Sequence, residues 1–114
     1  MMEISVLMPV FNTDPEYLSG AIESILAQTY PHSEFLIYDD CSTRSDTLDT
    51  LERYARRDER IRVIHGEKNV GPSTARNLLT DVASHPLCAL MDSDDIAHPR
   101  RFERQVEVGS EDRR

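Results

Sequence analysis

The sequence predicts an α/β domain with a Rossmann-like, mostly parallel sheet and helices on both of its faces. Three observations favour this fold class. Short apolar runs that suit buried strands alternate four times with segments of helical periodicity. Apolar residues, 39% of the 114, lie in these blocks rather than scattered along the chain, which is not the pattern of a disordered sequence. Aspartate clusters directly follow two of the predicted strands, where open parallel sheets bind their ligands.

The first predicted unit is a strand followed by a helix. Residues 4–8 form a short apolar run that ends at Pro9, which is typical of a buried strand. Asp14 can then cap a helix, and Pro15 suits the first helical position. Apolar residues at helical spacing carry this helix to Gln28.

The next two strands are shorter and are separated by a helix. Residues 35–38 predict the second strand, which ends at an aspartate pair. Residues 45–57 carry apolar side chains on one face and predict the second helix. Residues 61–64 predict a third strand, and the glycine and proline of residues 69–73 predict the turn that follows it.

The last part of the chain repeats the pattern once more. Residues 75–82 carry an apolar stripe and predict a helix, and residues 87–91 predict the fourth strand. Pro99 is expected to begin the last helix. We assign residues 1–108 to one domain and residues 109–114 to a polar tail, because this length supports one core but not two.

Composition excludes several classes of protein. The formal net charge of -8 argues against a nucleic-acid partner, because an acidic chain repels a phosphate backbone. The two cysteines are far apart and form no CxxC motif, so free thiols in a reducing compartment are expected. The chain shows neither a signal peptide nor an apolar run of about 18 residues, so we expect a cytoplasmic protein without a transmembrane segment.

The acidic segment Asp92–Asp95 is the strongest chemical signal. Right-handed crossovers place the carboxyl ends of parallel strands at one edge, so this segment should meet residues 9–12 and 39–40 there. Three carboxylates within four residues repel one another unless a cation or hydrogen bonds compensate. Mg²⁺ or Mn²⁺ would be coordinated by these carboxylate oxygens and would keep coordination sites open for substrate phosphates. The alternative is a polar turn that caps the helix near Pro99.

Two other residues at this edge allow alternative interpretations. Asp40 can accept hydrogen bonds from a ribose hydroxyl or a base N–H, or it can cap the turn of residues 41–43. Arg76 lies one turn into a predicted helix, where it can face a diphosphate together with the first N–H groups. It can equally pair with the acidic cluster. Both interpretations of Arg76 place it near that cluster.

Motifs of other nucleotide-binding and catalytic classes are missing from the sequence. No Gly-x-Gly-x-x-Gly follows the first strand, no Gly-Lys-Ser/Thr is present, and no Gly-x-Ser-x-Gly occurs. A receiver-like signalling domain would need an acidic pair after the first strand, where Pro9–Asn12 stands instead. These classes are therefore disfavoured.

Five segments, in order, resemble family 2 of the inverting glycosyltransferases, which have the A-type nucleotide-diphospho-sugar transferase fold. The resemblance covers residues 3–107, and Cys41 stands where the family usually has glycine or asparagine. It implies that the chain is the N-terminal half of such a domain. The segments are Val6–Asn12, Ile22–Tyr30, Tyr38–Thr43, Asn69–Asn77 and Met91–Asp95, with Pro99 beyond.

The resemblance also implies roles for individual residues. The residues expected to bind the nucleotide are Pro9, Val10, Phe11, Asn12, Asp40, Arg76, Asp92 and Ser93. Asp40 would accept the N–H of a uracil-like base, and Pro9–Phe11 would line the base pocket. Asp94 is the first candidate for the metal, with Asp95 as its rival, and the cation would be Mg²⁺ or Mn²⁺.

The implied reaction is metal-dependent transfer of a sugar, with inversion, from a nucleotide-diphospho-sugar that is expected to be UDP-linked to an acceptor hydroxyl. Such a transfer needs a base, which the family takes from its second half together with the acceptor site. We therefore expect the base beyond the chain end, assign no catalytic residue, and expect a fragment that is inactive alone. The alternative is a non-catalytic nucleotide-binding or assembly module of the same fold, and apolar surface left uncovered could drive formation of a homo-oligomer.

Overall fold

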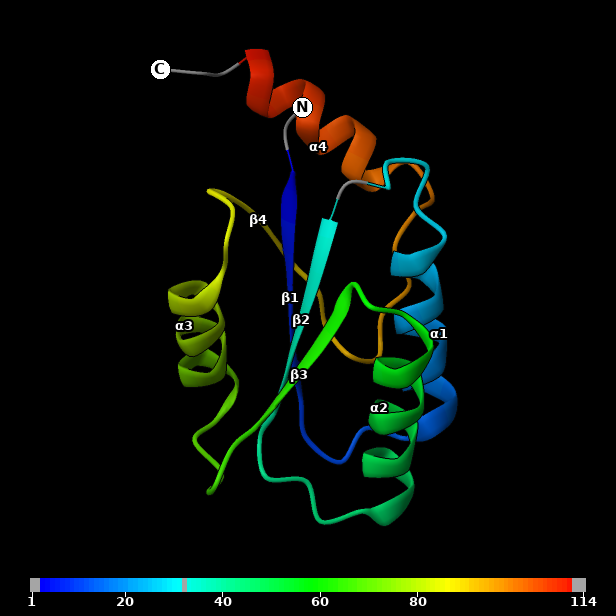
Figure 1. The fold of residues 1–114 in the computed structure, drawn as a ribbon, viewed down its shortest axis with the longest axis vertical. Coiled ribbons are helices and arrows are strands. Elements are labelled where there is room, and N and C mark those ends of the chain that lie inside the picture. Colours follow the sequence, from blue (N-terminus) through cyan, green and yellow to red (C-terminus); the bar gives the residue numbers. More distant parts are fainter. Residues whose placement is uncertain (1–2, 32, 112–114) are drawn as a thin grey trace.

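Four parallel strands form one sheet in the computed structural model, which describes residues 3–31 and 33–111 (Figure 1). In spatial order the strands are β3 (Ile61–His65), β2 (Ser33–Asp39), β1 (Ile4–Val10) and β4 (Leu87–Leu90). The helices are α1 (Pro15–Leu26), α2 (Ser45–Arg57), α3 (Pro72–Val82) and α4 (Arg101–Glu111). The predicted α/β class and the predicted alternation of strands and helices are confirmed.

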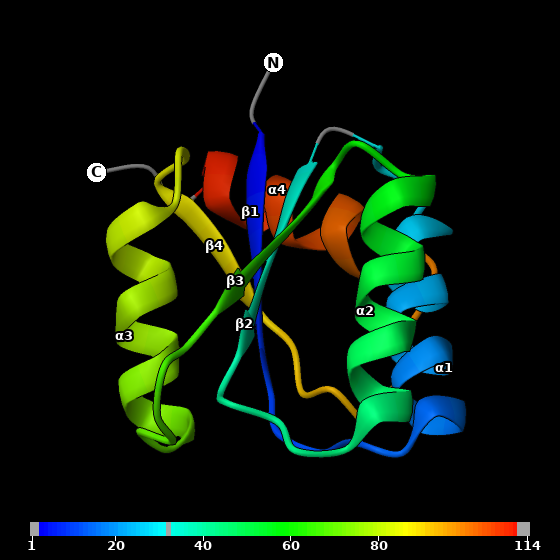
Figure 2. The same cartoon turned by 60° about the horizontal axis from the view of Figure 1, so that its bottom comes forward.

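Alternate side chains of the two central strands pack against different helical layers. Val6 and Met8 of β1 lie in a core with residues of α1 and α2, whereas Leu7 between them lies in a second core with α3. Phe35 and Leu36 of β2 divide between the two cores in the same way. Figure 2 shows α3 on one side of the sheet and α1 with α2 on the other. The expectation of helices on both faces is thus confirmed.

β1 continues two residues beyond the end predicted at residue 8. The N–H of Met91 donates to the carbonyl of Leu7 (3.0 Å), so Leu7 faces β4, and Pro9, two residues later, faces the same way. The pairing with β4 ends at Leu7 and Leu90, so the missing N–H of Pro9 costs no ladder hydrogen bond. Proline therefore fits inside this strand, and the prediction that it ends the strand was wrong.

α4 begins at Arg101, two residues after the start predicted at Pro99. The buried side chain of Gln28, which follows the C-terminal end of α1, explains this later start. The Oε1 of Gln28 accepts the N–H of Phe102 (3.0 Å), and its Nε2 donates to the carbonyl of His98 (2.7 Å). The sequence pattern predicts that α1 extends to Gln28, but the helix ends at Leu26. The Gln28 side chain is therefore available to cap the start of α4.

Side chains of α4 also cover the outer edge of β4. Because Met91 faces β1, the backbone groups of Cys88 and Leu90 face away from it. The carbonyl of Leu90 accepts a hydrogen bond from Arg101 (2.7 Å), and that of Cys88 accepts one from Gln105 (3.3 Å). These two carbonyls at the sheet edge are therefore satisfied without another strand.

The helical part of the chain extends beyond the predicted domain boundary. α4 reaches Glu111, so residues 109–111 of the expected polar tail are helical, and residues 112–114 lie outside the described residues. Within residues 3–31 and 33–111, none of the helices has the length and apolar content needed to cross a membrane.

Glu34 ties together three segments at the amino end of the sheet. Its carboxylate accepts hydrogen bonds from the Ser5 hydroxyl (2.6 Å) and from the N–H of Ser84 (2.6 Å), and the Ser5 Oγ accepts the N–H of His85 (3.1 Å). Burial raises the pKa of Glu34, but the hydrogen bonds from Ser5 and Ser84 outweigh it, so the pKa lies below its ordinary value.

The lowered pKa of Glu34 predicts an acid-dependent loss of stability. A carboxylate with a lowered folded-state pKa stabilises the fold above its unfolded pKa of about 4.3, and this stabilisation is lost as the pH falls through the folded-state pKa. The difference in unfolding free energy between the parent and Glu34→Gln should be largest above about pH 5 and should shrink below about pH 4. Urea unfolding across pH 3–7 measures it, with the exposed Glu59→Gln as control. A difference that does not change with pH would contradict the prediction.

Gly66 should tolerate no side chain. A Cβ at this position would lie 2.5 Å from the Tyr38 hydroxyl oxygen and 3.2 Å from the Asp39 carbonyl oxygen. Because the Tyr38 ring is buried against α3, we expect Gly66→Ala to lower the unfolding free energy by about 1–3 kcal/mol. Gly20→Ala is the control, since its Cβ would meet only the end of the exposed Ile96 side chain at 3.1 Å. Equal urea midpoints for the two variants would show that Gly66 has room.

Candidate functional site

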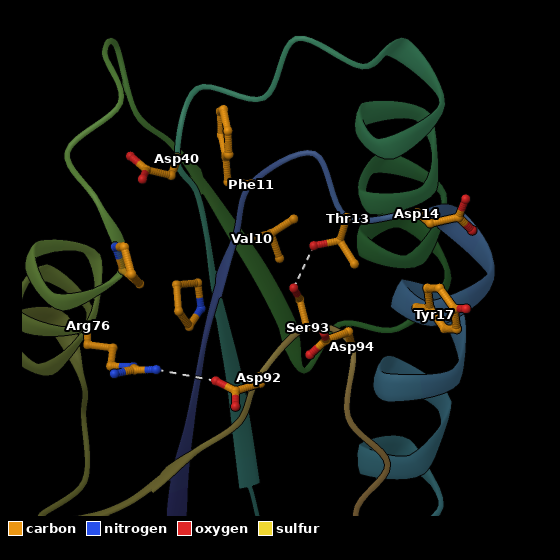
Figure 3. Close-up of a pocket in the computed structure, with 12 residues that line it drawn as sticks. Val10, Phe11, Thr13, Asp14, Tyr17, Asp40, Arg76, Asp92, Ser93 and Asp94 are labelled. Atoms are coloured by element: carbon orange, nitrogen blue, oxygen red, sulfur yellow. Dashed lines mark hydrogen bonds and ion pairs between the residues drawn. The ribbon is translucent and has the colours of Figure 1, made fainter.

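A cleft of about 430 Å³ opens at the carboxyl ends of β1, β2 and β4 (Figure 3). Its walls come from the segments after these strands and from the first turns of α1 and α3. The lining residues are Pro9, Val10, Phe11, Thr13, Asp14, Tyr17, Asp40, Pro72, Arg76, Asp92, Ser93 and Asp94. The three strand-end segments do therefore meet at one edge, and eight of the ten predicted site residues line the cleft there.

Opposite charges face each other across part of this cleft. The Nη2 of Arg76, from α3, lies 3.2 Å from the Oδ1 of Asp92, which follows β4 (Figure 3). Both side chains remain open to solvent, with 39% and 63% of their surfaces exposed. Exposed ion pairs of this kind contribute only about 0–1 kcal/mol, so either partner is available to a ligand of opposite charge.

Asp40 is buried and holds the turn that begins α3. Its Oδ1 accepts the N–H of Val70 (2.8 Å), and its Oδ2 accepts the N–H of Gly71 (2.9 Å). Gly71 has φ +90°, in the left-handed region that favours glycine, so a side chain at this position would strain the turn. Asp40 thereby sets where the α3 residues Pro72 and Arg76 stand in the cleft. Two carboxylate oxygens retain further acceptor capacity beyond these two bonds.

Asp39, rather than Asp40, stabilises the turn that follows β2. The Oδ1 of Asp39 accepts the N–H of Ser42 (3.0 Å), and its Oδ2 lies 2.8 Å from the Nδ1 of His65 at the end of β3. The alternative in which Asp40 caps residues 41–43 is therefore wrong. The cap is supplied by the neighbouring carboxylate, whose side chain points to the other side of the strand.

Asn12 lies at the same edge of the sheet but does not line the cleft. Its Oδ1 accepts the N–H groups of Thr43 (2.7 Å) and Arg44 (2.9 Å), and its Nδ2 donates to the Thr43 hydroxyl (3.0 Å). The expectation that Asn12 contacts a nucleotide is thus not supported by its position. Its side chain is directed at the segment after β2.

The acidic segment contributes two aspartates to the cleft and turns the third away. Asp92 and Asp94 line the cleft, whereas the Oδ1 of Asp95 accepts the N–H of Ile96 (2.9 Å) outside it. In the part of the chain that the structure describes, no group of three or more His, Cys, Asp or Glu side chains is arranged to hold a metal ion. Two exposed carboxylates match the needs of a hard dication that takes its other ligands from phosphate and water.

Four lining residues were missed from the sequence: Thr13, Asp14, Tyr17 and Pro72. The sequence predicts Asp14 only as a helix cap. It does cap α1, because its Oδ1 accepts the N–H of Glu16 (3.0 Å). Tyr17 carried a usable signal in the sequence, because it is a large side chain off the apolar stripe of α1. In the structure it is 62% exposed. Thr13 carried no signal in the sequence, because its contact is with a residue 80 positions away: its hydroxyl lies 2.6 Å from the Ser93 hydroxyl.

Solved structures share this fold. The crystal structure of S. aureus TarS 1-349 in complex with UDP-GlcNAc superposes with a TM-score of 0.86 at 28% identity, and the match covers 96% of this chain and 32% of that one. The four-stranded parallel sheet with its helices thus corresponds to the N-terminal, Rossmann-like part of the A-type fold of TarS.

Sequence comparison gives the same relationship. TuaG of Bacillus subtilis (strain 168) is 39% identical over 104 residues, which are 91% of this chain and 40% of TuaG. Glycosyltransferase GlyG of Streptococcus pneumoniae serotype 4 is 36% identical over 100 residues, covering 88% of this chain and 33% of GlyG. The chain therefore spans 40% or less of the length of these relatives. The sequence pattern of glycosyl transferase family 2 matches residues 5–114, nearly the whole chain, so the protein belongs to the family 2 glycosyltransferases.

Proposed function

We propose that the cleft binds a UDP-linked sugar and that the chain is the donor-binding part of an enzyme that transfers this sugar, with inversion, to an acceptor hydroxyl. The observation that carries the proposal is the opposition of Arg76 to Asp92 and Asp94 within one cleft at the strand ends. A diphosphate needs a cationic partner, and a divalent cation that binds the same diphosphate needs carboxylates. The complex of TarS with UDP-GlcNAc supports a nucleotide-sugar as the ligand class.

The cleft offers separate surroundings for the two ends of such a donor. At one end Phe11, which is 50% exposed, provides an aromatic face for a base, and Asp40 provides a carboxylate for a base N–H. At the other end Asp92 and Asp94 would hold Mg²⁺ or Mn²⁺. Such a cation, when bound, stabilises the negative charge that develops on a leaving diphosphate.

The Arg76–Asp92 ion pair gives this chain a way to accept both charges. A bound diphosphate attracts the guanidinium of Arg76, which releases Asp92 for the cation. Arg76 and Asp92 would thus exchange their ion pair for one contact each, with the diphosphate and the cation, and neither charge would be left unpaired. A cytoplasmic location and self-association remain predictions of the sequence.

The carboxylates that line the cleft leave little capacity for a catalytic base. Asp40 accepts two backbone N–H groups, Asp14 caps α1, and Asp92 pairs with Arg76. Only Asp94 lacks such a role among the cleft aspartates that the structure describes, and it would bind the cation. This arrangement favours a chain that binds donor but depends on another segment for the base, and it leaves the non-catalytic module as the second candidate.

Metal-dependent nucleotide binding provides the first test. Calorimetry should show that Mn²⁺ strengthens UDP binding and that Asp94→Asn and Asp92→Asn each reduce this gain by about tenfold or more, which corresponds to about 1.4 kcal/mol. Asp95→Asn is the matched control, because Asp95 carries the same charge outside the cleft. No UDP binding at millimolar concentration would reject the proposal, and an Asp95 effect as large as that of Asp94 would reject the metal assignment.

The second test separates donor binding from turnover. If the base lies outside these residues, the chain should bind UDP-linked sugars yet release no UDP above the uncatalysed rate in a coupled assay. Sustained UDP release that is lost in Asp94→Asn would contradict this expectation and would mean that the described residues include the catalytic base.

A further inference from the structure

The segment after β1 lies between the segments after β2 and β4, because β1 is the strand between those two in the sheet. Two consecutive residues of this central segment, Asn12 and Thr13, contact its two neighbours. Asn12 bonds only toward the β2 side in the described contacts, and the Thr13 hydroxyl bonds toward the β4 side. The two ends of the cleft are therefore linked through two adjacent residues.

Asn12 fixes the segment after β2 through four hydrogen bonds. Besides its three side-chain bonds to Thr43 and Arg44, its backbone N–H donates to the Ser42 Oγ (3.0 Å). Arg44 is the N-cap residue of α2 and makes no side-chain cap hydrogen bond. The Asn12 Oδ1 accepts the N–H of Arg44 itself, so it fixes the residue from which the helix starts. Asn12 has φ +51°, a conformation that asparagine tolerates better than most residues.

Thr13 connects the acidic segment to α2. Its hydroxyl lies 2.6 Å from the hydroxyl of Ser93, which stands between Asp92 and Asp94 (Figure 3). Its backbone carbonyl accepts the hydroxyl of Thr47 (2.8 Å), a fully buried residue in the first turn of α2. Thr13 thereby links the acidic segment to the first turn of α2.

We propose that Asn12 and Thr13 are positioning residues that set the distance between the two ends of the cleft, Asp40 at one and Asp92 with Asp94 at the other. This inference rests on the proposed function, because the ligand that spans the two ends is the UDP-sugar. Neither residue is a catalytic residue. Displacement of a positioned group by about 1 Å can cost a factor of about a hundred in activity, so we expect the loss of a hydrogen bond at Asn12 or Thr13 to weaken binding of a ligand that spans both ends.

The test compares variants that remove the bonds with variants that keep them. Thr13→Val removes the hydroxyl at nearly constant volume, and Thr13→Ser retains it. Asn12→Gly removes the side chain while allowing the positive φ, and Asn12→Asp retains the acceptor oxygens. Ser5→Ala is the control, since it removes a buried hydroxyl and its hydrogen bonds at the opposite end of the sheet.

Calorimetry should show a different loss for each residue. Thr13→Val should lower UDP affinity about tenfold in Mn²⁺ and change it less than about twofold without metal, while Asn12→Gly should lower it about tenfold under both conditions. Thr13→Ser and Asn12→Asp should bind within about threefold of the parent. Ser5→Ala should lose stability, measured by urea unfolding, but keep the parent affinity. Parent-like binding by Thr13→Val and Asn12→Gly, or an equal loss in Ser5→Ala, would overturn the inference.

Amide hydrogen exchange without any ligand keeps the inference separate from the proposed function. Exchange at residues 92–96 should accelerate in Thr13→Val but not in Thr13→Ser, and exchange at residues 42–44 should accelerate in Asn12→Gly but not in Asn12→Asp. If the parent binds no UDP, the proposed function fails while this comparison still decides whether the two residues hold the loops. Unchanged exchange in both removal variants would overturn the positioning role.

Discussion

β1 pairs along both of its edges, with β2 on one side and β4 on the other, and all of the pairing is parallel. The rest of the molecule follows from this constraint. Parallel neighbours need a helical crossover, so the connections cover both faces of the sheet, and every strand delivers its following residues to the same edge. The cleft is therefore a consequence of topology, and the side chains at the edge decide what it can bind.

Asp40 shows how one buried group serves both the fold and the site. A buried carboxylate is costly unless its oxygens receive hydrogen bonds, and here two backbone N–H groups of the turn before α3 supply them. The same two bonds fix the entry to α3, one turn before Arg76. Asp40, which lies at one end of the cleft, thus also fixes the helix that carries Arg76, and a change at Asp40 would displace Arg76 as well.

Local patterns predicted the parts of the fold that depend on local physics. The bounds of α2, the capping of α1 by Asp14 and the alternation of the units were predictable from helical spacing and turn residues. The parts that were missed depend on partners distant in sequence. Pro9 is tolerated because β4 ends early, α4 starts late because Gln28 caps it, and Asn12 turns from the cleft toward Thr43. In the site, charge and order along the chain predicted which residues meet, but not which way Asn12 and Asp95 face.

The cover that α4 places over β4 has a consequence for how this sheet can grow. An open edge strand is a template for accidental strand addition, and here Arg101 and Gln105 occupy the carbonyls that an incoming strand would use. Both donors stand on a helix whose Phe102 is fully buried in the core, so the packing of α4 holds them over the edge. The edge is thus guarded against accidental pairing by side chains that the packing of α4 holds in place.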